Sequence, residues 1–378
     1  MSRKAIAGVA LAGCAGIVAA AVFAVPAAAG TSAESSAAGL VFLQSNDPAG
    51  NSVVVYDRHS DGTLTAAGTY ATGGAGGLLD AAPDFDQLAS QGSVTYDGAR
   101  KLLYAVNAGS NSVTVFAVHD GKLRRVQVIG SGGVFPVSVA VHGAVAYVVN
   151  ARDGGSIQGF LRVRDQLIRV PVWHRSLGLD TSLTPEFLST PGDVAFTPSG
   201  NKLVVTTKIN GNQLDVFNLD PLGRPSGRPV VTTEPGAVPF AVTFDALGHL
   251  DVAGAAGSVA SYAVNPDGSL TLVDSRPTNQ EATCWIVSAG GHVFASNTAS
   301  DTVSGYTAQP DGLTDLGLTA TDAAPTDSAA SPDGRYLYLR AGGVGRVDEL
   351  AVGPDGQLTQ IGWVSTPAGI AGDGLAAS

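Results

Sequence analysis

The chain is built from short runs of apolar residues that alternate with polar bends rich in Asn, Asp and Gly. Four such runs follow one another between Ser138 and Val170, at 138–141, 146–150, 156–160 and 166–170. Short runs that are rich in Val and aromatic residues and are bounded by turn residues predict β-strands. This stretch therefore predicts four consecutive strands.

The same group of four strands returns along the chain. An Asp-Gly pair precedes the last strand of the group at five places: Asp61-Gly62, Asp120-Gly121, Asp267-Gly268, Asp311-Gly312 and Asp355-Gly356. Where no insertion intervenes, the period is 44 residues. Four short strands at such a period are typical of a β-propeller blade. Seven copies predict an all-β fold, a seven-bladed β-propeller of four-stranded antiparallel blades.

The first and last repeats complement each other. Leu40–Gln44 matches the second strand of a blade, so the first blade lacks its first strand at the N-terminal end. Residues 370–378 resemble residues 325–331, where the first strand of the last blade is predicted. We therefore expect the C-terminal strand to pair into blade one and close the ring, which removes exposed sheet edges.

Strand order assigns the connections to two faces of the ring, because adjacent antiparallel strands turn alternately at the two ends of a sheet. The turns after the first and third strands share one face, here called the turn face. The bends after the second strands and the crossovers between blades share the other, the loop face. The loop face carries both long insertions, Gly73–Gly92 and Val172–Gly192. Long loops often carry function, so we expect a site where the central channel opens on the loop face.

The N-terminus resembles a targeting segment. Arg3 and Lys4 precede an uncharged, Ala-rich stretch, Ala5–Ala29, which predicts a secretory signal peptide and a secreted, extracellular protein. Lipidation of Cys14 and an uncleaved membrane anchor remain open as alternatives. The expected organisation is a signal peptide at 1–29, a flexible leader at 30–39 and one propeller domain at 40–378. We expect the mature protein to be a monomer without a membrane span.

Charge and cysteine content narrow the chemistry. The formal net charge is −11 and no local cluster of basic residues is present, so nucleic acid is not an expected partner. Cys284 is the only cysteine beyond the predicted signal peptide, which excludes an intramolecular disulfide in the mature chain. No zinc motif occurs, and no cofactor or metal is predicted. A Ca²⁺ site of Asp, Asn and carbonyl oxygens at the channel mouth is chemically possible, although no spacing demands it.

Polar and aromatic side chains at the expected channel mouth form a candidate ligand-binding set. Its members are Gln91, Asn107, Asn150, Trp173, His174, Phe240, Trp285, Asn297 and Asp327. Each Asn has a structural alternative, because an Asn after a strand often bonds its own backbone in a turn. Asp327 can instead brace neighbouring blades by accepting backbone N–H groups. Lys208 stands where its repeat predicts an Asn.

Several repeats resemble the lactonase family of seven-bladed propellers. The matching motifs are Asn46–Pro48 with Val53–Tyr56, Tyr104–Ser110 and Ser331–Tyr338. That family includes cytosolic 6-phosphogluconolactonase and the fungal carboxymuconate lactonising enzymes, and it shares the wider Tyr-Val-Thr-Asn type of repeat. The resemblance extends over about residues 40–378 and implies a propeller that hydrolyses or forms a sugar or organic-acid lactone.

The chain departs from the family at one motif. Catalytic members typically place His, Glu and Arg at the channel mouth, with the His often directly after a Pro before a first strand. The matching positions here hold Val137, Gly192 and Phe240.

Two hypotheses about function follow. In the first, a secreted lactonase, Glu281 or Glu234 activates water as a general base. Lys208 or Arg152 then stabilises the oxyanion or holds a carboxylate of the small-molecule lactone. In the second, a non-catalytic extracellular propeller binds a small molecule or a protein partner at a concave, aromatic-lined surface.

Overall fold

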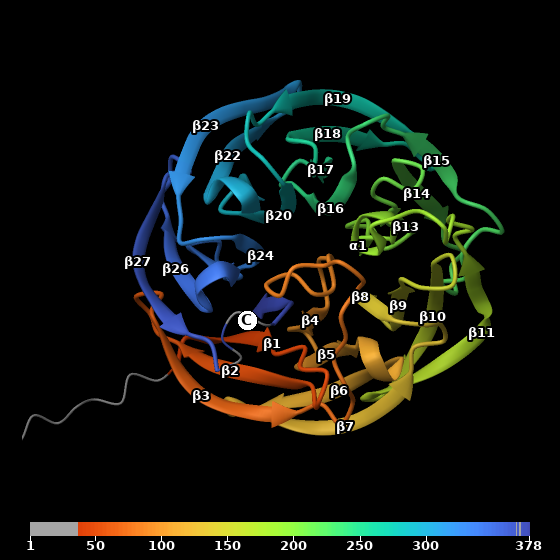
Figure 1. Cartoon of the computed structure of the whole chain (residues 1–378), viewed down its shortest axis with the longest axis horizontal. Coiled ribbons are helices and arrows are strands. Elements are labelled where there is room, and N and C mark those ends of the chain that lie inside the picture. Colours follow the sequence, from red (N-terminus) through yellow and green to blue (C-terminus); the bar gives the residue numbers. More distant parts are fainter. Residues whose placement is uncertain (1–36, 368, 370–371) are drawn as a thin grey trace, which may run out of the picture. The chain divides into compact units, whose positions relative to one another are not determined.

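The computed structural model describes residues 37–367, 369 and 372–378. The predicted signal peptide and most of the predicted leader lie outside these residues. The described residues belong to the compact unit that begins at Ser36. They form seven four-stranded antiparallel sheets arranged as the blades of a ring (Figure 1), which confirms the predicted fold class.

Each blade is a meander whose innermost strand lines the centre of the ring. With the innermost strand first, the blades are β28 (Leu375–Ala377), β1 (Gly39–Gln44), β2 (Ser52–Arg58) and β3 (Leu64–Ala71); β4 (Val94–Asp97), β5 (Leu102–Asn107), β6 (Ser112–His119) and β7 (Lys122–Gly130); β8 (Pro136–His142), β9 (Val145–Asn150), β10 (Ser156–Val163) and β11 (Gln166–Ser176); β12 (Val194–Phe196), β13 (Lys202–Thr206), β14 (Gln213–Asn218) and β15 (Val230–Thr233); β16 (Pro239–Phe244), β17 (Leu250–Gly254), β18 (Ser258–Val264) and β19 (Leu270–Pro277); β20 (Thr283–Ala289), β21 (His292–Asn297), β22 (Thr302–Gln309) and β23 (Gly312–Ala320); β24 (Pro325–Ala330), β25 (Tyr336–Ala341), β26 (Arg346–Val352) and β27 (Leu358–Ser365). The helical elements of the described residues are α1 (Glu186–Ser189) and the 3₁₀ turns η1 (Ala108–Ser110), η2 (Thr298–Ser300) and η3 (Gly342–Val344).

The C-terminus closes the ring as predicted. β28 pairs with β1 in antiparallel register, with Phe42 opposite Ala376. The closing strand is also tied to blade seven, because the backbone N–H of Leu375 donates to Oδ2 of Asp327 at 3.0 Å. This bond confirms the bracing role considered for Asp327.

Burial follows the position of a strand in its blade. Every residue of β5 and β25 is buried, whereas the outermost strands β7 and β27 keep about every second side chain in solvent. The middle strands are covered on both faces by neighbouring blades, so their sequences are almost continuously apolar. This packing explains why the second and third strands of each repeat gave the clearest pattern.

One boundary was predicted wrongly. The second insertion was expected to begin at Val172, but β11 continues to Ser176. Trp173 packs against Tyr147 with the two rings nearly parallel at 6.3 Å between centroids, so it belongs to the blade core and extends the strand.

Candidate functional site

The first insertion fills the channel mouth. Residues 73–92, here called the channel loop, connect β3 with β4 and run into the centre of the ring (Figure 1). Three backbone carbonyls of the loop accept hydrogen bonds from three different blades. The donors are Trp285 Nε1 to Ser90 at 2.8 Å, Arg340 Nη1 to Phe85 at 2.7 Å and Lys208 Nζ to Ala89 at 2.8 Å.

Blade one also fastens the channel loop. Asp373 Oδ2 accepts the backbone N–H groups of Gln87 and Leu88, both at 3.1 Å. Asn46 Nδ2 donates to the carbonyl of Gly77 at 2.8 Å, and Asn46 Oδ1 accepts the N–H of the same residue at 3.1 Å. Because these contacts come from blades one, four, six and seven, the loop is a fixed part of the propeller rather than a free surface loop.

Burial beneath the channel loop shifts the titration of the charged groups there. It raises the pKa of Asp86 to about 6, although Lys208 and Arg340 nearby act in the opposite direction. Burial likewise lowers the pKa of Lys208 to about 7, although the negative charge of Asp86 acts to raise it. Asp193 accepts hydrogen bonds from Ser138 and from the backbone of Val242, and its burial raises its pKa to about 7. These groups hold blades and loop together.

Most residues predicted at the channel mouth are therefore covered. Phe240 and Trp285 are buried and pack against each other at 4.9 Å between ring centroids. Gln91 spans two blades, because its side chain donates to the carbonyl of Val242 and accepts from the N–H of Ile286, both at 3.0 Å. Beneath the loop these side chains form hydrogen bonds or pack within the protein. The structure therefore does not support their predicted contact with a ligand.

The Asn side chains after the second strands stabilise their own bends. Asn107 donates to Ser112 Oγ and Thr114 Oγ1 at 3.1 and 2.9 Å. Asn297 makes the equivalent bonds to Thr302 and Ser304, and Asn150 lies 3.5 Å from Ser156 Oγ. All three amides are fully buried. These residues are structural, but they bond Ser and Thr hydroxyl groups across the bend and not their own backbone, which was the alternative considered for them.

Two further candidates lie on the outermost strand of blade three. Trp173 is buried against Tyr147, and His174 is exposed and pairs with Gln158 of β10. Their expected place on the second insertion was wrong, because β11 extends through both.

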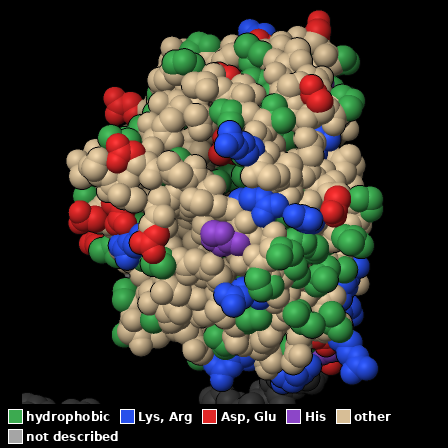
Figure 2. Space-filling model, turned by 90° about the vertical axis from the view of Figure 1, so that its right-hand side faces the viewer, with side chains coloured by type: hydrophobic (Ala, Val, Ile, Leu, Met, Phe, Trp, Pro, Cys, Tyr) green, Lys and Arg blue, Asp and Glu red, His purple; other side chains and the backbone are tan. Residues whose placement is uncertain are grey.

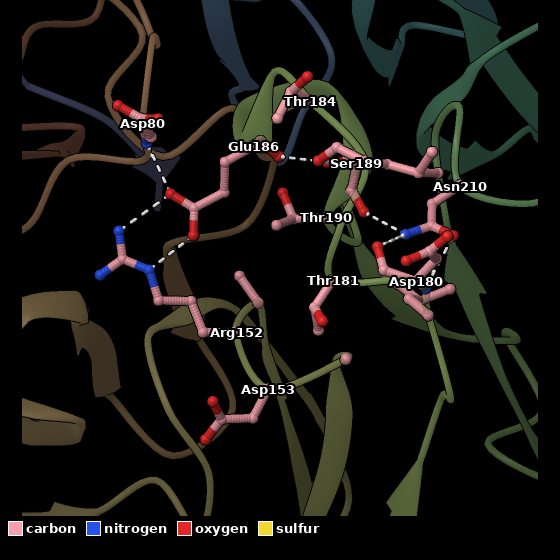
Figure 3. A pocket seen from close by; sticks show the side chains of 14 residues that line it. Asp80, Arg152, Asp153, Asp180, Thr181, Thr184, Glu186, Ser189, Thr190 and Asn210 are labelled. Carbon is pink, nitrogen blue, oxygen red and sulfur yellow. Dashed lines mark hydrogen bonds and ion pairs between the residues drawn. The ribbon is translucent and has the colours of Figure 1, made fainter.

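An open pocket lies beside the channel loop, over blades three and four (Figure 3). It has a volume of about 500 Å³. Its walls come from the channel loop, the bend after β9 and the second insertion, and its lining includes Asp80, Arg152, Asp153, Asp180, Thr181, Leu183, Glu186, Ser189, Thr190 and Asn210. The carboxylates come from Asp80, Asp153, Asp180 and Glu186, whereas Arg152 supplies the cation.

Arg152 and Glu186 form the fixed centre of the pocket wall. Arg152 Nε and Nη2 bond the two carboxylate oxygens of Glu186 at 2.7 and 3.0 Å, and the guanidinium stacks over the ring of Phe135 at 4.2 Å. The hydrogen bond from Arg152 lowers the pKa of Glu186 and raises that of Arg152. Bidentate pairing fixes both side chains in orientation. The pair also joins the second insertion to the bend after β9.

Hydrogen bonds hold the rest of the second insertion in place. Asn210 donates to the carbonyls of Asp180 and Ser189 at 2.9 and 2.8 Å. Ser189 Oγ bonds the carbonyl of Leu183 at 2.9 Å, and Thr190 Oγ1 lies 3.2 Å from Lys208 Nζ. The pocket floor is thus built on the same buried lysine that holds the channel loop.

Only one of the predicted catalytic residues lines the pocket, namely Arg152. Glu281 lies in the crossover that precedes β20 and is exposed; its backbone N–H bonds Ser300 Oγ. Glu234 lies in the crossover after β15, where its charge adds to burial in raising the pKa of Tyr262. Lys208 is fully buried and bonded to the protein. The structure does not bring the two glutamates to Lys208 or Arg152, and their catalytic roles stay predictions.

Sequence reasoning missed Asp153, Glu186 and Thr190. Asp153 follows Arg152 directly, and Glu186 lies in an insertion that was expected to be functional. Their positions in the sequence could therefore have indicated that they belong to the site, although their residue types alone could not. Among the described residues, no group of three or more His, Cys, Asp and Glu side chains is arranged to hold a metal ion. Within the same residues, no helix combines the length and the apolarity that crossing a membrane requires.

Comparisons with known proteins agree with the fold. The family model described as lactonase, seven-bladed β-propeller, matches residues 49–166. No curated protein matches the sequence.

Three solved structures share the fold. A protein of Bacteroides fragilis assigned as a 6-phosphogluconolactonase has 17% identity and a TM-score of 0.69, and the match covers 92% of this chain and 99% of that one. A second such protein, from Bacteroides uniformis, has 16% identity and a TM-score of 0.71 over 90% of this chain and 99% of the other. The periplasmic gluconolactonase of Pseudomonas aeruginosa has 16% identity and a TM-score of 0.71 over 88% and 97%. Matches at this identity establish the fold alone. The chain is therefore a seven-bladed β-propeller, and its predicted resemblance to the lactonase family is confirmed by the family match over residues 49–166.

Proposed function

We propose that the protein hydrolyses a lactone in the pocket beside Arg152, and not at the centre of the ring. The observation that carries the proposal is the fixed Arg152–Glu186 pair, which faces an open cavity of about 500 Å³ while the channel mouth is filled. The family match and the names of the similar solved structures, two assigned as 6-phosphogluconolactonases and one a gluconolactonase, support the reaction class.

Asp153 is the proposed general base. It lines the pocket, and no described residue forms a hydrogen bond or an ion pair with its carboxylate. Glu186 is not free to accept a proton from water, because both of its carboxylate oxygens are bonded to Arg152 and this pairing lowers its pKa. Asp180 is engaged with Ser182, whose hydroxyl and N–H bond its Oδ1. In this scheme Asp153 removes a proton from a water molecule that attacks the carbonyl carbon of the lactone.

Arg152 is the proposed oxyanion stabiliser. Its guanidinium is held rigid by Glu186 and Phe135, so it can face the carbonyl oxygen of a bound lactone without reorganising. The bond between the carbonyl carbon and the ring oxygen then breaks, and the proton from water ends on that oxygen, which leaves as a hydroxyl group. The product is an open hydroxy acid.

The charge of the pocket favours an uncharged substrate. Four carboxylates line the cavity, and its arginine is already neutralised by one of them. A phosphate group would enter against repulsion from the remaining carboxylates, whereas the hydroxyl groups of a neutral sugar lactone could bond Thr181, Thr190 and the aspartates.

The experiment is proton release at constant pH with glucono-δ-lactone, measured above the spontaneous rate. We expect Asp153→Asn to lower kcat/KM by about 100-fold or more. The control is Asp84→Asn, which makes the same change on an exposed residue of the channel loop outside the pocket. Loss of activity in both variants, or in neither, contradicts the assignment. Saturable lactone binding without turnover would instead indicate the non-catalytic binding propeller.

Export of the protein is a further part of the proposal. It is supported by Arg3 and Lys4 before the uncharged stretch Ala5–Ala29. Intact-mass analysis of the protein recovered from the culture medium tests it, and a chain that begins near Gly30 is the expected result. A lipidated Cys14 or a complete N-terminus on membrane-bound protein would establish one of the two alternatives.

A further inference from the structure

The basic residues of the chain are concentrated in one part of the ring. Residues 100–175 contain ten of the 21 Lys and Arg residues but three of the 32 Asp and Glu residues. This stretch therefore has a formal charge of +7, and the rest of the chain has −18. In the sequence only two pairs of these residues are adjacent, Arg100-Lys101 and Arg124-Arg125; folding collects the rest from separate strands and turns of blades two and three.

Seven of these residues form what we call the basic wall. They lie on the outer strands of blades two and three and in the adjoining turn: Lys122, Arg124, Arg125, Arg162, Arg164, Arg169 and Arg175. The two outermost strands adjoin, because the side chain of Gln127 on β7 bonds both the N–H and the carbonyl of Leu167 on β11. Within the described residues, no ion pair joins any of the seven to a carboxylate.

Exposed apolar side chains accompany the basic wall. Leu161 and Ile168 are paired across β10 and β11, and Val163 lies two residues further along the same face. Val163 and Ile168 are each about half exposed, and Val172 is 64% exposed. Figure 2 faces this side of the ring and shows Lys and Arg side chains beside hydrophobic ones in the lower right of the view. Leu161, Val163 and Ile168 share one face of these strands, whereas Arg162 and Arg169 lie on the other, so the apolar side chains and the cations border the same outer edge of blade three. An exposed apolar patch bordered by charged groups marks an interaction surface.

We propose that the basic wall docks the propeller onto an anionic lipid surface. Lys and Arg near such a surface gain attraction from the lipid headgroups, and the apolar side chains can enter the interface between headgroups and acyl chains. The distribution of charge agrees with this occupant. Residues 100–175 carry a formal charge of +7 and the rest of the chain −18, so this part of the ring is the one attracted to an anionic surface.

The test is co-sedimentation of the exported protein, purified from the culture medium, with vesicles of phosphatidylcholine alone or with about 40% phosphatidylglycerol. The readout is the ratio of the two partition coefficients, because an uncharged N-terminal anchor would bind both kinds of vesicle. We expect wild-type protein to prefer the anionic vesicles and to lose that preference in high salt. The variant Arg124→Glu, Arg125→Glu, Arg169→Glu should reduce the ratio by ~10-fold or more.

A control variant makes the same change in charge elsewhere. Arg224→Glu, Arg228→Glu, Arg335→Glu alters exposed arginines of blades four and seven, and should keep the preference. A third variant, Val163→Ser, Ile168→Ser, keeps the charges and should reduce the ratio less. Thermal unfolding of all variants excludes loss of fold as the cause. Equal binding to both vesicles, equal effects of the two triple variants, or preferential binding of an RNA or an acidic protein through the same arginines would overturn the lipid surface as occupant.

Discussion

The indole Nε1 of Trp285 lies 2.8 Å from the carbonyl oxygen of Ser90, and this bond ties the innermost strand of blade six to the loop between blades one and two. It is one of several contacts by which the channel loop fills the centre of the ring. The consequence is functional, because a ligand cannot use an opening that the chain itself occupies. The open pocket beside Arg152 then becomes the candidate site.

The channel loop should exchange its amide hydrogens as slowly as the inner strands. The N–H groups of Gln87 and Leu88 both donate to buried Asp373, so their exchange requires the loop to leave the channel. Hydrogen–deuterium exchange measured by mass spectrometry checks this. In Asp373→Ala the peptide around Gln87 should lose protection while β5 keeps it. Rapid exchange of the loop in the wild type would show that the channel is open in solution.

Loss of Lys208 should loosen the loop and the pocket floor together. In Lys208→Met the carbonyls of Ala89 and Phe187 and the hydroxyl of Thr190 lose their shared donor. Buried acceptors without partners cost about 1–3 kcal/mol, and we expect a loss of this size in the free energy of unfolding measured with urea. Lys122→Met, on an exposed strand end, is the matched control and should change stability by less than about 0.5 kcal/mol. Equal stability of the two variants would contradict the role of Lys208.

Ring closure should depend on the last strand. Leu375 is buried between blades one and seven, so Leu375→Ala should lower the free energy of unfolding by about 2–4 kcal/mol. Leu318→Ala makes the same truncation on the half-exposed outer strand β23 and should cost about 0.5 kcal/mol or less. Urea denaturation compares the two. Similar losses would show that the C-terminal strand does not hold the ring.

Asp215 should make stability depend on pH. Burial raises its pKa to about 6, and its Oδ1 has no hydrogen-bond partner. Because the folded-state pKa lies above the unfolded value, the folded chain binds the proton more tightly, and stability falls as pH rises from about 4 to about 6. Asp215→Asn should therefore stabilise the protein by up to about 3 kcal/mol at pH 8 and leave it nearly unchanged at pH 4. Thermal unfolding at both pH values checks this, and stabilisation of the same size at both would contradict it.

The blades could be predicted from the sequence because each repeat carries its own strand and turn pattern. The channel loop could not, since its course depends on contacts such as Asp373 with Gln87, which lie 286 residues apart. Arg152 was predicted as a cation of the site, but its partner Glu186 lies in a non-repeating insertion. The basic wall was missed for a related reason. Its arginines are dispersed among apolar positions, and adjacent blades bring them together.

The most direct test of the central claim is a crystal structure of the protein with glucono-δ-lactam, which resembles the lactone but resists hydrolysis. We predict that the lactam lies in the pocket, with its carbonyl oxygen toward Arg152 and its carbonyl carbon near a water molecule bound to Asp153. The channel loop should keep its bonds to Trp285 and Asp373. A lactam bound at the centre of the ring with the channel loop displaced, or bound at Glu281 or Glu234, would contradict the account.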